Sequence, residues 1–211
     1  MTGPVVWPSL KRNLVAILRG ITPADIESVV EALLEEGFEA IEVPLNSPEA
    51  FISIDLARRL APQSILIGAG TVLKLEQVDR LADTGGNLMV TPNSVPEVIS
   101  RAAGLGLVTM PGAFTATEAL AAAEAGASAI KFFPANVLGP SGIAAIRAIL
   151  PAGLPLGAVG GVSDANFADY AKVGVTCFGM GTSLYKPGDS AAVVRERAIK
   201  TVAAYDQLPA A

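Results

Sequence analysis

The chain has no histidine and a single cysteine, Cys177, among its 211 residues. One cysteine cannot form an intrachain disulfide, and without histidine the chain cannot assemble a zinc site of the Cys/His type. We therefore expect no metal and no cofactor, and a carboxylate rather than an imidazole as the general base. A lone thiol also fits the reducing environment of the cytoplasm.

Charged residues are scarce as well, at 17% of the chain, and the net charge is -5. The scattered lysines and arginines form no basic stripe, which argues against nucleic acid as a partner. No apolar run is long enough to span a membrane, and the run at residues 14–18 is too short for a signal peptide. Because 51% of the residues are hydrophobic, the surface should carry extended apolar area, which favours a homo-oligomer.

Eight short apolar runs alternate with helical stretches along the chain. The runs cover residues 14–18, 40–43, 65–67, 88–90, 107–110, 129–133, 156–159 and 176–180. Helices are expected near residues 23–36, 48–60, 75–83, 95–104, 116–125, 141–150, 164–173 and 190–205. Eight such units predict an α/β fold, a single (β/α)8 TIM barrel over residues 1–211, with a short extra N-terminal helix at residues 5–13 covering the barrel floor.

A doubly wound open sheet is the alternative arrangement of alternating strands and helices. It is disfavoured because no GxGxxG sequence follows the first run, and glycine-rich turns follow the third, seventh and eighth runs instead. In a barrel, the functional face is formed by the C-terminal ends of the strands and the loops behind them. Candidate site residues are therefore expected at those ends.

Lys131 lies inside the apolar run at residues 129–134. Burial disfavours an ammonium ion and lowers the lysine pKa from about 10.4 toward about 7 to 8, which leaves a neutral amine near neutral pH. Such an amine attacks a ketone or an aldehyde and forms a Schiff base, which becomes an electron sink once protonated. The alternative is a lysine at a strand end that pairs with a carboxylate or extends to solvent.

Glu42 is the charged residue of the second apolar run, and Lys131 takes the corresponding place in the sixth. Alternate strands of a barrel contribute to the same interior layer, so the two side chains should project toward one another across the barrel axis. Glu42 could then serve Lys131 as general acid and base. The alternative is a buried ion pair with a purely structural role.

Glycine-rich turns follow the seventh and eighth runs, the positions at which barrels commonly bind phosphate. The first turn contains Gly160 and Gly161, and the second contains Gly181 and Thr182. Exposed backbone N–H groups in such turns complement a dianion, which predicts a phosphorylated substrate.

Two further polar residues follow strand ends and could hold a substrate carboxylate. Arg19 follows the first run, and its guanidinium can bind a carboxylate through two N–H groups. Thr71 follows the third run and offers a hydroxyl. Arg19 could instead be an ordinary surface or subunit-contact residue.

The sequence resembles the KDPG/KDPGal aldolase family, and most closely its 2-dehydro-3-deoxy-6-phosphogalactonate branch. The similarity runs from about residue 10 to the end of the chain, and is carried by AILRGI at 16–21, IEVPLNSP at 41–48, GAGTVL at 68–73, VTPN at 90–93, KFFP at 131–134 and AVGGV at 158–162.

The resemblance implies a role for each candidate residue. Lys131 would be the Schiff-base lysine and Glu42 the general acid/base, Arg19 and Thr71 would contact the carboxylate, and Gly160, Gly161, Gly181 and Thr182 would form the phosphate site. It also implies a homotrimer. Relatives often carry serine at position 182, so either Thr182 or Ser183 could supply the hydroxyl to the phosphate.

Val159 precedes the phosphate turn, at a position where relatives that prefer the gluconate epimer resemble Pro-Thr-Gly-Gly. Valine is nearly isosteric with threonine but cannot hydrogen-bond the C4 oxygen of the substrate. We therefore expect a class I aldolase that cleaves 2-dehydro-3-deoxy-6-phospho-D-galactonate, a phosphorylated keto acid. The alternatives are an aldolase for the gluconate epimer, an isomerase or synthase without an iminium step, and a barrel that only binds phosphometabolites.

Overall fold

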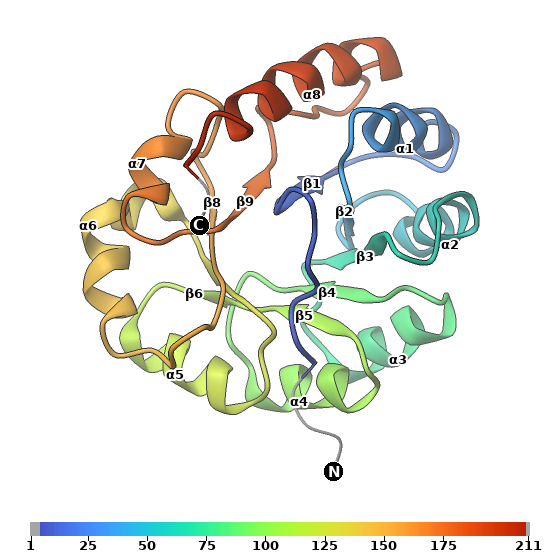
Figure 1. Ribbon diagram of the computed structural model, residues 1–211. Helices are drawn as coiled ribbons and strands as arrows, with labels where there is room; N and C mark the ends of the chain where they lie inside the picture. The colour runs from blue at the N-terminus through green and yellow to red at the C-terminus, as the bar shows by residue number, and fades with distance from the viewer. Residues whose placement is uncertain (1–4, 210–211) are drawn as a thin grey trace.

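The computed structural model describes residues 5–209, in which eight helices surround a single parallel sheet (Figure 1). The strands are β1 (Leu14–Ile17), β2 (Ala40–Pro44), β3 (Leu66–Gly70), β4 (Leu88–Val90), β5 (Val108–Met110), β6 (Gly112–Ala113), β7 (Ile130–Phe132), β8 (Leu156–Val159) and β9 (Cys177–Met180). The helices are α1 (Ile26–Glu35), α2 (Ala50–Leu60), α3 (Leu75–Asp83), α4 (Pro96–Gly104), α5 (Ala116–Glu124), α6 (Ala135–Arg147), α7 (Phe167–Ala171) and α8 (Ala191–Tyr205). The expected barrel of alternating strands and helices is confirmed.

The strands form one sheet in the order β5-β4-β3-β2-β1-β9-β8-β7-β6. Strands β5 and β6 are two halves of the fifth barrel strand, which is interrupted at Pro111 because proline has no N–H for the ladder. The Thr109 carbonyl accepts hydrogen bonds from the N–H groups of Ser128 and Ala129, each at 3.1 Å, and the Pro111 carbonyl accepts one from Lys131 N–H at 2.8 Å. These bonds close the barrel between its fifth and sixth strands.

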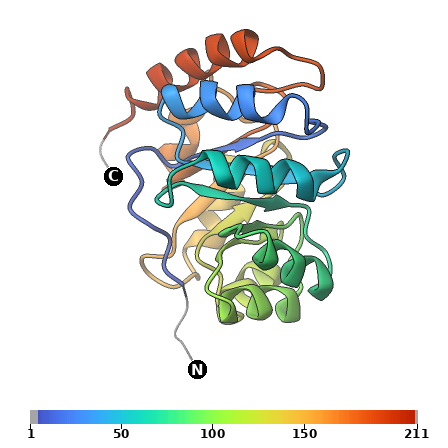
Figure 2. The ribbon, with the colours of Figure 1, turned by 90° about the vertical axis from the view of Figure 1, so that its right-hand side faces the viewer.

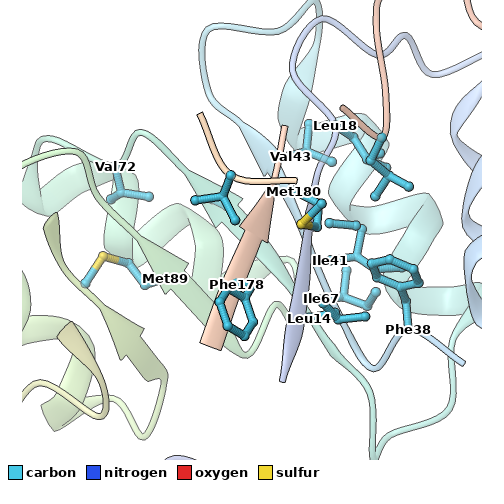
Figure 3. Packing of buried hydrophobic residues seen from close by; sticks show 14 of the residues in the cluster. Leu14, Leu18, Phe38, Ile41, Val43, Ile67, Val72, Met89, Phe178 and Met180 are labelled. Carbon is cyan, nitrogen blue, oxygen red and sulfur yellow. The ribbon is translucent and has the colours of Figure 1, made fainter. Parts of the chain in front are cut away.

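Hydrophobic side chains pack on both faces of the sheet, as parallel strands require. The outer cluster lies between strands and helices and includes Leu14, Ile41, Ile67 and Phe178 (Figure 3). The inner cluster fills the lower barrel and consists of Trp7, Val15, Ala40, Leu66, Leu88, Val90, Val108, Met110, Ala129 and Cys177. The two clusters fix the direction in which each strand residue points.

The expected extra helix at residues 5–13 is wrong. These residues have no helical structure and cross one end of the barrel as an irregular segment, seen in dark blue in Figure 2. Pro8 lacks an N–H and disfavours helical backbone at Trp7 before it. The segment does cover the barrel floor, because the Trp7 ring is buried in the inner cluster and its Nε1 donates to Asn13 Oδ1 at 2.9 Å.

The helix expected at residues 141–150 begins earlier, at Ala135, directly after the strand that carries Lys131. It consists of two helical pieces, because Gly139 has a positive φ of 70° and Pro140 follows it. The early start places a helical turn beside the end of β7, where it packs against the loop after β8. None of the helices within residues 5–209 is long and apolar enough to cross a membrane.

Candidate active site

Glu42 and Lys131 point into the upper barrel. Side chains alternate along a strand, and Ala40 and Ala129 both belong to the inner cluster. Glu42 and Lys131, two residues further along in the direction of the C-terminal ends, therefore also face inward. The carboxylate and the amine interact electrostatically: the amine lowers the pKa of Glu42, and the carboxylate raises the pKa of Lys131.

Lys131 is buried and only 6% exposed. Burial lowers its pKa from 10.5 to about 8, opposed by the negative charge of Glu42 and assisted by the positive charge of Arg19. Among the residues that the structure describes, no ion pair or side-chain hydrogen bond involves the amine. The Phe133 ring lies beside the amine, with its centroid 5.2 Å from Nζ.

The Glu42 side chain is 3% exposed, and its Oε2 has no hydrogen-bond partner within the described part of the chain. Burial raises its pKa from 4.5 to about 7, against the opposing influence of Lys131 and then Arg19. A carboxyl group with a pKa near neutrality can both accept and return a proton at physiological pH. Glu42 and Lys131 therefore have the protonation properties of a general acid/base and a nucleophile.

A cavity of about 460 Å³ opens at the C-terminal ends of β1, β8 and β9. It is lined by Ile17, Arg19, Phe133, Val159, Gly160, Gly161, Val162, Ser163, Gly179, Gly181, Thr182, Ser183 and Lys186. Gly160 and Gly161 have positive φ values of 93° and 70°, and a Cβ on Gly161 would lie 2.6 Å from the Cβ of Asn136. Glycine is therefore required for this turn to pack against the start of α6.

The two hydroxyls of the second turn differ in their partners. Ser183 Oγ donates to the Val162 carbonyl at 3.2 Å, which ties the second turn to the first. The Thr182 side chain is exposed and makes no side-chain hydrogen bond within residues 5–209. Thr182 is therefore the hydroxyl free to meet a ligand.

Arg19 and Thr71 approach the barrel interior from the strand ends. Arg19 Nη1 donates to Asn46 Oδ1 at 2.5 Å, so the guanidinium is oriented by the loop after β2. Thr71 has a φ of 57°, an unusual value for a β-branched residue. It directly follows Gly70, whose Cα faces the Glu42 carboxylate. Strained backbone of this kind is often retained at functional sites.

The structure thus brings most of the candidate residues to one face of the barrel. Arg19, Val159, Gly160, Gly161, Gly181 and Thr182 line the cavity. Glu42, Lys131 and Thr71 lie outside the lining, and Phe133 connects the two groups because its ring meets both the cavity and the Lys131 amine. The sequence patterns did not point to Asn46, Phe133 and Asn136, although all three lie within four residues after a strand end.

A family model described as KDPG and KHG aldolase matches residues 9–198. The chain belongs to this family. It is 65% identical over 199 residues to a probable 2-dehydro-3-deoxy-6-phosphogalactonate aldolase of Rhizobium meliloti, with 94% of each chain covered. It is 47% identical over 195 residues to the 2-dehydro-3-deoxy-6-phosphogalactonate aldolase of Escherichia coli, covering 92% of this chain and 95% of the relative.

A solved structure described as native KDPGal has the same fold. It superposes with a TM-score of 0.93 at 46% identity, and the match covers 96% of this chain and 98% of the other. The family resemblance carried by the strand-end motifs is thereby confirmed, and the barrel is that of a KDPG and KHG aldolase.

Proposed function

We propose that the protein is a class I aldolase that cleaves 2-dehydro-3-deoxy-6-phospho-D-galactonate into pyruvate and D-glyceraldehyde 3-phosphate. The observation that carries this proposal is the buried, unpaired Lys131 amine, which shares the upper barrel with Glu42. A purely structural ion pair would bring the two groups into direct contact, whereas here no ion pair joins them. Membership of the aldolase family and the names of its relatives support the same activity.

The reaction begins when the neutral Lys131 amine attacks the C2 ketone of the substrate. Glu42 supplies the protons that convert the carbinolamine into an iminium with loss of water. A base, Glu42 acting through water, removes the C4 hydroxyl proton, and the C3–C4 bond breaks as its electron pair moves into the iminium. The aldehyde leaves, and Glu42 reprotonates C3 of the enamine before hydrolysis releases pyruvate.

The phosphorylated end of the substrate fits the 460 Å³ cavity between the two glycine turns. Backbone N–H groups of Gly160, Gly161 and Gly181 and the hydroxyl of Thr182 are the donors offered to the phosphate there. The keto-acid end then points toward Lys131, with its carboxylate bound by Arg19 and Thr71. Val159 lies between these ends and faces the C4 region, which supports preference for the galactonate epimer.

Two wider features belong to the same proposal. The resemblance to the family and the exposed large hydrophobic residues, among them Val137 and Ile149, support a homotrimer. The single cysteine, buried in the inner cluster, supports a cytoplasmic location.

Intact-mass analysis after incubation with pyruvate and borohydride tests the mechanism. We expect one pyruvate-derived group per chain, located on Lys131 by peptide mapping, because borohydride reduces an iminium to a stable amine. The Lys131→Ala variant should gain no such group. An unlabelled wild-type chain at saturating pyruvate would favour a barrel that only binds phosphometabolites, and a label on Lys74, Lys172 or Lys186 would contradict the assignment of Lys131.

A further inference from the structure

Lys186 lines the cavity together with both glycine turns, yet the phosphate site described above gives it no role. It lies in the loop after β9, and its side chain is exposed. Within residues 5–209 its ammonium group makes no ion pair. A full positive charge is therefore available at the cavity wall.

The backbone that carries Lys186 is held in place by a chain of polar contacts from α8. Asp189 Oδ2 accepts from Lys186 N–H at 2.8 Å and from Arg197 Nη1 at 2.5 Å. Arg197 Nη1 also donates to the Leu184 carbonyl at 3.2 Å. Because the Lys186 N–H is bonded to Asp189 and the Leu184 carbonyl is bonded to Arg197, the backbone that carries the Lys186 side chain has a defined position.

The same loop packs against the turn that carries Arg19. A Cβ on Gly20 would lie 2.6 Å from Pro187 Cγ, so the two turns are in close contact where Gly20 has a φ of 84°. Arg19 and Lys186 thus reach one cavity from adjoining turns. No aspartate or glutamate is present among the described residues that line it. The cavity lining therefore carries two cationic side chains, Arg19 and Lys186, which favours an anionic ligand.

We propose that Lys186 binds the phosphate of the substrate and selects phosphorylated over unphosphorylated aldehydes. This inference rests on the proposed aldolase function and deepens it. Arg19 is oriented by Asn46, and its charge reaches Glu42 and Lys131, which places it with the keto-acid end. The glycine turns contribute only backbone dipoles and a hydroxyl. Lys186 adds a formal positive charge to these dipoles, as a point charge that needs no bidentate geometry.

The test compares Lys186→Met with wild type in the condensation of pyruvate with two aldehydes. For D-glyceraldehyde 3-phosphate, kcat/KM should fall by about 10- to 100-fold, mainly through KM, because one charge-assisted hydrogen bond is lost. For D-glyceraldehyde, kcat/KM should change less than about 2-fold, and borohydride trapping of pyruvate should be unchanged. The Lys186→Arg variant should recover most of the preference for the phosphorylated aldehyde.

Lys172→Met is the matched control, because Lys172 is an exposed lysine outside the cavity that pairs with Asp169 at 3.4 Å. It should retain the wild-type preference. Equal losses on both aldehydes, or an undiminished preference in Lys186→Met, would overturn the assignment. If wild type itself fails to trap pyruvate, the aldolase proposal fails separately. Titration with inorganic phosphate then decides the role of Lys186, and equal affinity of wild type and Lys186→Met would refute it.

Discussion

The Glu42 carboxylate occupies the space above Gly70 in which any other residue would place its Cβ. Gly70 lies on the neighbouring strand β3, and its φ is not in the left-handed region, so an alanine would fit the backbone there. Glycine is needed at this position because a side chain would overlap the carboxylate, and not because the backbone turn requires it. Gly70, the second glycine of the GAGT sequence at 68–71, therefore makes room for the carboxylate that we propose as the acid/base.

Gly70→Ala should inactivate the enzyme without unfolding it. The added methyl group overlaps the Glu42 carboxylate, which must then leave its position. We expect kcat for aldol cleavage to fall by roughly 10²-fold or more, close to the loss caused by removing the acid/base. Gly104→Ala is the control, because a Cβ at Gly104 meets nothing within 4 Å, and it should keep full activity. Wild-type turnover in Gly70→Ala would show that the position of the carboxylate is not critical.

Glu42→Gln should slow turnover by roughly 10² to 10⁴, the usual contribution of a positioned general acid/base. The amide has the same shape as the carboxylate but cannot exchange protons, so the chain should retain its circular dichroism spectrum. Steady-state cleavage and the rate of pyruvate trapping should both fall. A near-wild-type rate would return Glu42 to a structural role.

The buried carboxyl group should also make stability depend on pH. Burial raises the pKa of Glu42 from 4.5 to about 7, so between these values the folded protein keeps a proton that the unfolded chain has released. This stabilisation is fully present below pH 4.5 and is lost as the pH rises through 7. The difference in unfolding free energy, wild type minus Glu42→Gln, should fall by about 2 to 3 kcal/mol between pH 4.5 and 7. Urea unfolding of both proteins at several pH values measures it, and a flat difference would contradict the shifted pKa.

Val159→Thr should shift the epimer preference toward the gluconate substrate. Val159 is 7% exposed, lines the cavity and packs its methyl groups against Gly179, so a threonine fits the same space. Its hydroxyl could hydrogen-bond the C4 oxygen of the gluconate epimer, which corresponds to about 1 to 2 kcal/mol in the ratio of kcat/KM values. Kinetics with both epimers measure this ratio.

Val159→Ala separates the effect of the hydroxyl from that of volume, since it removes methyl groups and adds no polar atom. The ratio should move toward gluconate only in the threonine variant. If both variants shift it equally, the shape of the cavity and not a hydrogen bond sets the preference. A wild-type preference for gluconate would overturn the galactonate assignment and leave the aldolase mechanism standing.

Strand positions and inward-facing residues could be predicted because they depend on local periodicity. The apolar runs locate each barrel strand within about three residues, and Glu42 and Lys131 stand out as charged residues inside them. Because side chains alternate between the two faces along a strand, both side chains are then expected to point into the barrel. These features require no knowledge of tertiary contacts.

Other features depend on contacts that no periodicity encodes. The segment around Trp7 has a turn-like composition, and only its burial in the barrel floor explains its path. The early start of α6 accompanies the packing of Asn136 against Gly161, a contact between distant parts of the sequence. Lys186 is an ordinary exposed lysine by sequence, and its place in the cavity results from the contact between Pro187 and Gly20.

The Trp7 ring also limits the routes into the barrel interior. It closes the lower end of the barrel, and the apolar side chains stacked above it leave the catalytic mouth as the route to Lys131. We expect the substrate to enter through that mouth. Substrate, water and both products should then share the opening at the strand ends, because the opposite end of the molecule is closed.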